Sequence, residues 1–157
     1  LCRFEGVQVV LVSPEALQMP PEIVEGLRNT GHHVLESDQL EESIAHVDIV
    51  YSTRIQEERF SSQEEADLYR GRFRLNQSIY TRHCEPNTVI MHPLPRDSRV
   101  NARELDDDLN DNPNLAIFRQ TDNGLLLRMA LFALILDVVE QVDEHARDVN
   151  WYTGGRF

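Results

Sequence analysis

Short apolar runs rich in β-branched residues alternate along the chain with segments whose apolar residues recur every three or four positions. The first pattern predicts buried strands and the second predicts amphipathic helices. The expected strands lie at residues 7–12, 33–35, 48–52, 88–91 and 116–118. The expected helices lie at residues 20–28, 39–46, 64–70, 76–83, 104–109 and 124–147.

Strands that alternate with helices favour a parallel sheet covered by helices on both faces. We therefore expect an α/β fold: a three-layer sandwich with a doubly wound, mostly parallel, Rossmann-like sheet and a long C-terminal helix. One domain is expected to span residues 1–150, followed by an irregular tail at residues 151–157.

The long C-terminal helix has an unusual pattern. We expect Asp122 or Asn123 to cap its start, and apolar side chains between Leu125 and Leu136 point nearly all round it. A helix that is apolar on all sides is buried on all sides. One flank should pack against the sheet, and the other flank should need a second protein surface to cover it.

The segment from Thr88 to Arg96 is the most informative stretch of the chain. Its apolar run ends abruptly in Pro93 and Pro95, which have no N–H to donate and cannot continue a ladder. The chain must leave the sheet here in a stiff turn, at the carboxyl end of a strand, where open α/β sheets bind ligands. Carbonyl oxygens on such a rigid turn suit a substrate that carries N–H donors.

Arg54 follows another predicted strand end, and Gln56 and Glu58 lie close to it in sequence. A guanidinium at this position can bind a carboxylate through two charge-assisted hydrogen bonds. Glu58, four residues later, could orient it. The alternative is a solvated Arg/Glu surface cluster, which is the commoner reason for such a pattern.

His92 has no serine or cysteine nucleophile beside it and no acidic residue at a telling spacing. We therefore expect a structural histidine rather than a general base. The acidic residues at 106–108 are expected to be solvated or to lie at a helix start. His32 and His33 point to opposite faces of a strand, so they cannot easily share a metal ion.

Composition narrows the function further. The formal charge is −12, from 27 acidic and 15 basic residues, which argues against a nucleic-acid partner. The basic residues are all arginine, through drift in an Arg-rich genome or, less simply, adaptation to salt. Any catalytic lysine must therefore come from outside this segment.

The sequence also argues against several kinds of site. Cys2 and Cys84 fit neither a metal site nor a disulfide framework, and no glycine-rich phosphate loop is present. We expect no metal and no cofactor. No apolar run has the length of a membrane span, and no signal peptide pattern appears, so we expect a cytoplasmic protein without membrane contact. Because it starts at Leu1, we interpret the chain as a piece of a longer protein.

Four motifs, in register from about residue 7 to residue 136, resemble the aspartate carbamoyltransferases. They are Ser13-Pro14-Glu15-Ala16-Leu17, Thr53-Arg54-Ile55-Gln56-x-Glu58-Arg59, His92-Pro93-Leu94-Pro95-Arg96 and Phe118-Arg119-Gln120-x-x-Asn123-Gly124. Ornithine carbamoyltransferases typically have cysteine in place of Pro93. The resemblance covers the aspartate-binding half only, so it implies that the carbamoyl phosphate domain lies outside this chain.

The resemblance implies roles for single residues. Arg54 would clamp a carboxylate of L-aspartate, Gln56 would help to place it, and Glu58 would orient Arg54. Arg59 would bridge to the other domain.

In the proline turn, the carbonyls of Pro93 and Leu94 would hold the carbamoyl amide and the attacking amine. Pro95 would follow a cis peptide and share the carbamoyl phosphate site, with His92 and Arg96 in support. One departure matters: Asp97-Ser98-Arg99-Val100 stands where the family commonly has Val-Asp-Glu-Ile, which braces a mobile loop near Tyr69.

The implied activity is transfer of a carbamoyl group from carbamoyl phosphate to L-aspartate, early in pyrimidine synthesis. The resemblance also implies a homotrimer of the full-length chain and leaves room for a regulatory subunit. No catalytic residue is expected in this half, so the isolated chain should be inactive. A carbamoyltransferase with another amino acceptor, or a non-catalytic binding module, stays open.

Overall fold

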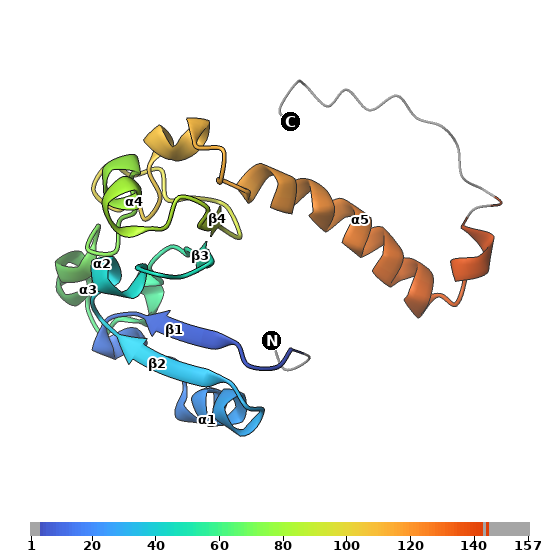
Figure 1. Cartoon of the computed structure of the whole chain (residues 1–157), viewed down its shortest axis with the longest axis horizontal. Helices are drawn as coiled ribbons and strands as arrows, with labels where there is room; N and C mark the ends of the chain where they lie inside the picture. The colour runs from blue at the N-terminus through green and yellow to red at the C-terminus, as the bar shows by residue number, and fades with distance from the viewer. Residues whose placement is uncertain (1–3, 143, 145–157) are drawn as a thin grey trace. The chain divides into compact units, whose positions relative to one another are not determined.

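Two parallel strand pairs are present in the computed structural model of the chain, which describes residues 4–142 and 144 (Figure 1). Strand β1 (Gln8–Val12) pairs with β2 (His33–Ser37), and β3 (Ile49–Tyr51) pairs with β4 (Val89–Met91). The predicted α/β class with parallel strands is confirmed. Within the described residues, the strands form two separate two-stranded ladders.

Helices connect these strands close to the predicted positions. The α-helices are α1 (Pro21–Asn29), α2 (Leu40–Ser43), α3 (Gln63–Tyr69), α4 (Gln77–His83) and α5 (Ile117–Ile135). The 3-10 turns are η1 (Glu15–Leu17), η2 (Glu57–Arg59), η3 (Asp107–Asp111) and η4 (Val139–Gln141). Asn76 caps α4, because its Oδ1 accepts the N–H of Ile79 at 2.8 Å.

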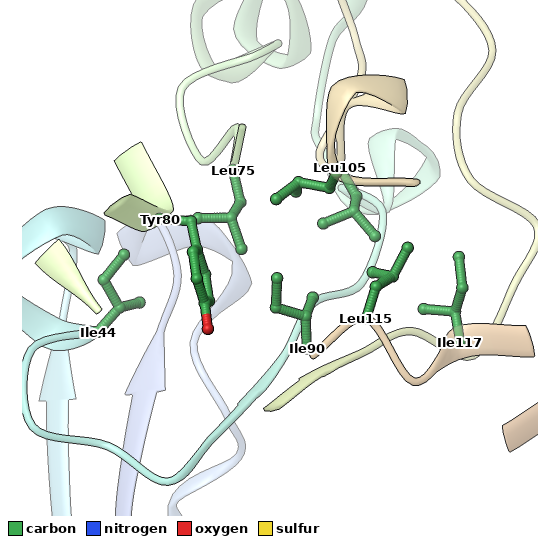
Figure 2. Packing of buried hydrophobic residues seen from close by; sticks show 8 residues of the cluster. Ile44, Leu75, Tyr80, Ile90, Leu105, Leu115 and Ile117 are labelled. Carbon is green, nitrogen blue, oxygen red and sulfur yellow. The ribbon is translucent and has the colours of Figure 1, made fainter. Parts of the chain in front are cut away.

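A core of buried side chains fixes β4 and the segments around it (Figure 2). Ile90 of β4 is fully buried and lies beside Leu115 and the ring of Tyr80. The Tyr80 hydroxyl donates to the carbonyl of Thr88 at 2.8 Å and accepts from Asn114 Nδ2 at 2.8 Å. The strand that leads into the proline turn is therefore anchored by both packing and buried hydrogen bonds.

The predicted strand at residues 116–118 is wrong. Leu115 makes a single parallel bridge to Ile90, and helix α5 begins two residues later, at Ile117. The N–H of Gln120 already bonds to the carbonyl of Ala116 at 2.8 Å, so the backbone has entered a helical path. Asp122 and Asn123, the predicted caps, lie inside α5.

The predicted helix also extends too far. Helix α5 ends at Ile135, and Asp137 adopts a left-handed conformation with φ 56°, which breaks the helical path. The expected tail at residues 151–157 lies outside the described residues, as do residues 145–147.

The chain divides after Gln120 into two units, residues 1–120 and residues 121–157. Most of α5 belongs to the second unit, where side chains such as Leu127 and Phe132 are exposed. The expected burial of this helix on all sides is therefore not met within the described residues. None of the described helices is both long and apolar enough to cross a bilayer.

Candidate functional site

Two loop segments leave the sheet side by side. Tyr51 and Met91 are register partners at the ends of β3 and β4, and the N–H of Ser52 donates to the Met91 carbonyl at 2.9 Å. Residues 52–59 and 92–97 therefore start at the same edge of one parallel ladder (Figure 1). The strands predicted at residues 48–52 and 88–91 thus end next to each other. Ser13, just after β1, extends the other ladder, because its N–H donates to the Ser37 carbonyl at 3.0 Å.

Arg54 and Glu58 form a two-pronged ion pair in the first segment. Arg54 Nη1 donates to Glu58 Oε2 at 3.1 Å and Nη2 donates to Oε1 at 2.6 Å. These hydrogen bonds hold the pKa of the Glu58 carboxyl at about 2 and raise the pKa of Arg54. The charges of Asp97 and Glu104 also raise it, so the second segment contributes to the field at Arg54.

The proline turn of the second segment is tightly defined. Leu94 has φ 54°, in the left-handed region, and the Leu94–Pro95 peptide bond is cis. His92 is fully buried, and its Nδ1 accepts the Leu94 N–H at 2.8 Å. Gln120 accepts the His92 N–H through Oε1 at 3.1 Å.

The remaining predicted site residues differ in their surroundings. Gln56 and Arg59 are exposed. The positive charge of Arg59 helps to lower the pKa of the Glu58 carboxyl. Arg96 instead turns towards η3, donating to Asn110 Oδ1 at 3.0 Å. Pro93 and Pro95 are exposed while Leu94 is half-buried, so the turn presents backbone at the surface.

A shallow pocket of about 580 Å³ lies against the proline turn. Its lining residues are Leu94, Pro95, Arg96, Asp97, Ser98, Arg103 and Asp107. The lining carries both signs of charge, and Asp107 pairs with Arg103 at 2.8 Å and with Arg96 at 3.6 Å. No group of three His, Cys, Asp or Glu side chains in the described residues is placed to hold a metal ion.

Sequence reasoning missed the acidic partner of His92. Glu104 is only 3% exposed, and its Oε1 lies 2.7 Å from His92 Nε2. It lies two residues before the acidic residues 106–108, which were predicted to be solvated or to lie at a helix start. Asp106 is buried rather than solvated, but it does lie at the start of η3. Arg74 binds the buried Asp106 carboxylate through Nε and Nη2, both at 2.6 Å. No local pattern distinguishes these two carboxylates from their exposed neighbours.

The departure at residues 97–100 has a structural counterpart. Arg99 bonds to Asp97 and to Glu57, and Glu57 also binds Arg70, next to Tyr69. Gly71 follows with φ 73°, and an added Cβ there would lie 3.0 Å from the Asn101 carbonyl oxygen. The segment after the proline turn therefore packs directly against the stretch near Tyr69.

Most of the chain matches the model of a known protein family. Residues 1–135 match the model described as "Aspartate/ornithine carbamoyltransferase, Asp/Orn binding domain". The chain belongs to this carbamoyltransferase family.

Individual carbamoyltransferases match closely as well. The aspartate carbamoyltransferase catalytic subunit of Saccharophagus degradans is 74% identical over 154 residues, covering 98% of this chain and 46% of that protein. The catalytic subunit of Cellvibrio japonicus is 69% identical over 160 residues, covering 99% of this chain and 47% of that protein. The chain thus spans about half the length of these relatives.

Solved carbamoyltransferase structures share the fold. The catalytic subunit of M. jannaschii aspartate transcarbamoylase has a TM-score of 0.71 at 34% identity, over 87% of this chain and 42% of that one. The Trypanosoma cruzi enzyme in complex with N-(phosphonacetyl)-L-aspartic acid has a TM-score of 0.67 at 30% identity, over 80% and 39%.

Proposed function

We propose that this chain is the aspartate-binding half of an aspartate carbamoyltransferase catalytic subunit. The observation that carries the proposal is the pairing of Arg54 and the proline turn at adjacent strand ends, in a chain 74% identical to such a subunit. The guanidinium would bind a carboxylate of L-aspartate, assisted by Gln56. The carbonyls of Pro93 and Leu94 would accept N–H groups of the carbamoyl moiety and the attacking amine.

The proposed reaction is acyl transfer without a covalent enzyme intermediate. The α-amine nitrogen of L-aspartate forms a bond to the carbonyl carbon of carbamoyl phosphate, and the bond from that carbon to the phosphate oxygen breaks. The amine loses a proton, and phosphate leaves with the bonding electron pair. Holding two reactants in line can contribute up to about 7–11 kcal/mol, and this half of the enzyme would supply the orientation of aspartate.

The test replaces Arg54 by alanine in a full-length polypeptide that carries this sequence. We expect the KM for aspartate to rise at least 100-fold and kcat to fall, because a charge-assisted, two-pronged contact with the substrate is lost. Arg82→Ala is the matched control, since Arg82 lies on α4 and donates only to Ser78 Oγ in the described contacts, at 3.0 Å. Near-normal aspartate kinetics for Arg54→Ala would refute the assignment.

A substrate panel separates the alternatives. The wild-type polypeptide is assayed with carbamoyl phosphate and, in turn, L-aspartate, ornithine and acetylated ornithine. Transfer to aspartate alone supports the proposal, whereas a preference for either ornithine points to a carbamoyltransferase with another acceptor. No transfer to any acceptor would support a non-catalytic binding module.

The assembly and location belong to the same proposal. A homotrimer of the full-length chain in the cytoplasm, with a regulatory subunit as a further partner, follows from the resemblance to the family. Sedimentation of the full-length protein alone, and with co-expressed neighbouring gene products, tests both partners.

A further inference from the structure

One buried carboxylate holds the proline turn from both sides. Upstream, Glu104 Oε1 lies 2.7 Å from His92 Nε2. Downstream, the N–H of Asp97 donates to Glu104 Oε1 at 3.2 Å and to Oε2 at 3.3 Å. Both ends of the segment 92–97 therefore contact the same side chain, that of Glu104.

The contacts of His92 define which tautomer its ring adopts. Its Nδ1 accepts the Leu94 N–H at 2.8 Å, so this nitrogen carries no proton. The proton must then sit on Nε2, which faces Glu104. The carboxylate oxygen is close to Nε2 but makes no aligned hydrogen bond with it, so the contact is chiefly electrostatic. A carboxylate at this place favours the Nε2–H tautomer that leaves Nδ1 as an acceptor.

The tautomer matters because Leu94 is held in an unfavourable conformation. A non-glycine residue at φ 54° costs about 1–2 kcal/mol relative to the right-handed regions. The hydrogen bond from the Leu94 N–H to His92 Nδ1 offsets that cost. It also fixes the plane of the Pro93–Leu94 peptide group, and with it the direction of the Pro93 carbonyl.

We infer that Glu104 is a positioning residue for the carbamoyl transfer. It acts through His92 and through the Asp97 N–H to aim the turn carbonyls at the reacting groups. This inference rests on the proposed function, since it names what aims the carbonyls that function uses. In the proposed function, the aspartate carboxylate is bound by Arg54, which lies on the other segment. Loss of the Glu104 contacts should therefore affect turnover more than aspartate affinity.

The experiment uses conservative variants of the full-length protein. Glu104→Gln removes the negative charge that faces His92 and leaves one oxygen in place of the two that the Asp97 N–H approaches. We expect kcat to fall at least tenfold with the KM for aspartate changed less than threefold, because small misplacement of a positioning group lowers turnover steeply. Asp106→Asn is the matched control: it neutralises a second buried carboxylate, bound by Arg74 and outside the turn. Its kcat should stay within threefold of wild type.

A second pair of variants tests the relay through His92. In His92→Asn the side-chain oxygen can accept the N–H two residues on, as asparagine does in turns, whereas His92→Leu offers no acceptor. We expect the asparagine variant to retain at least several-fold more turnover than the leucine variant. Nitrogen NMR of the labelled histidine should show an unprotonated Nδ1 in wild type and a mixture of tautomers in Glu104→Gln.

The outcomes separate this inference from the proposed function. An active wild type with equal kcat in Glu104→Gln, or with a protonated Nδ1 on His92, overturns the positioning role and leaves the proposed function standing. A wild type without carbamoyl transfer activity overturns both. If Glu104→Gln fails to fold, the comparison of His92→Asn with His92→Leu decides the relay.

Discussion

Arg99 and Glu57 form a two-pronged ion pair that joins the two segments of the candidate site. Arg99 Nη2 donates to Glu57 Oε1 at 2.7 Å and Nη1 donates to Oε2 at 3.2 Å, across 42 residues of sequence. Arg70 binds the same carboxylate through Nε at 3.1 Å and Nη2 at 2.9 Å. The turn η2, which follows Arg54, is thereby tied to the segment that follows the proline turn.

This ion pair should make stability depend on pH in a defined window. Hydrogen bonds from Arg70 and Arg99 lower the pKa of Glu57 from 4.5 to about 2. A carboxyl whose folded pKa is depressed stabilises the fold above its unfolded pKa, and this contribution is lost as the pH falls from 4.5 towards 2. We expect Arg99→Ala to lower the free energy of unfolding only modestly at pH 7, because Arg99 is half-exposed and solvent screens the pair.

Urea unfolding of the chain at pH 7, 4 and 3 measures the effect. The difference between wild type and Arg99→Ala should shrink as the pH falls, while the exposed-arginine control Arg82→Ala should change little at any pH. An equal loss at all three pH values would mean that Arg99 stabilises the fold by packing alone.

Gln120 joins the two strand ends at the site. Its Oε1 accepts the His92 N–H at 3.1 Å and its Nε2 donates to the Tyr51 hydroxyl at 3.1 Å. We expect Gln120→Ala to cost about 1–2 kcal/mol, because the backbone N–H of a buried residue loses its partner. Tyr51→Phe should cost less, since Tyr51 is exposed.

A double-mutant cycle in urea unfolding checks the connection. If the amide bridges the two groups, Tyr51→Phe should add almost nothing in the Gln120→Ala background, giving a coupling of about 0.5–1 kcal/mol. Strictly additive losses would show that the two hydrogen bonds act independently.

His32 is buried, and its ring has no hydrogen bond to any residue that the structure describes. It is 5% exposed, and neither Nδ1 nor Nε2 has a partner within the described residues. Desolvating an unpaired polar nitrogen costs about 1–3 kcal/mol, so His32→Leu should raise the free energy of unfolding by about 1 kcal/mol. Thermal or urea unfolding measures this, with the exposed neighbour His33→Gln as the control. A clear loss of stability in His32→Leu would contradict the prediction.

The sequence predicted the strands of the site well. Val89-Ile90-Met91 and Ile49-Val50-Tyr51 are short apolar runs with clear ends, and both proved to be strands. Their parallel pairing follows from the helical segments between them, because a parallel connection needs a crossover. The exit of the chain at Pro93 was equally clear, since proline cannot continue a ladder.

The start of α5 was misplaced for a physical reason. Ala116-Ile117-Phe118 is apolar and short, and such a run is compatible with either a strand or a helix. The single bridge between Leu115 and Ile90 decides the matter, because the backbone turns into the helix directly after it. That bridge depends on a strand 25 positions earlier, which no local pattern reveals.

The sequence by itself determined where strands end and which side chains follow them, because periodicity and proline chemistry act over a few residues. It therefore indicated Arg54, Gln56 and the proline turn as candidate ligand groups. Only the tertiary structure decided that Glu104 is buried against His92 and that Gln120 links Tyr51 to the turn. The burial and partners of a polar side chain depend on segments far apart in the chain. The local sequence of an acidic run is therefore the same whether water or a histidine contacts it.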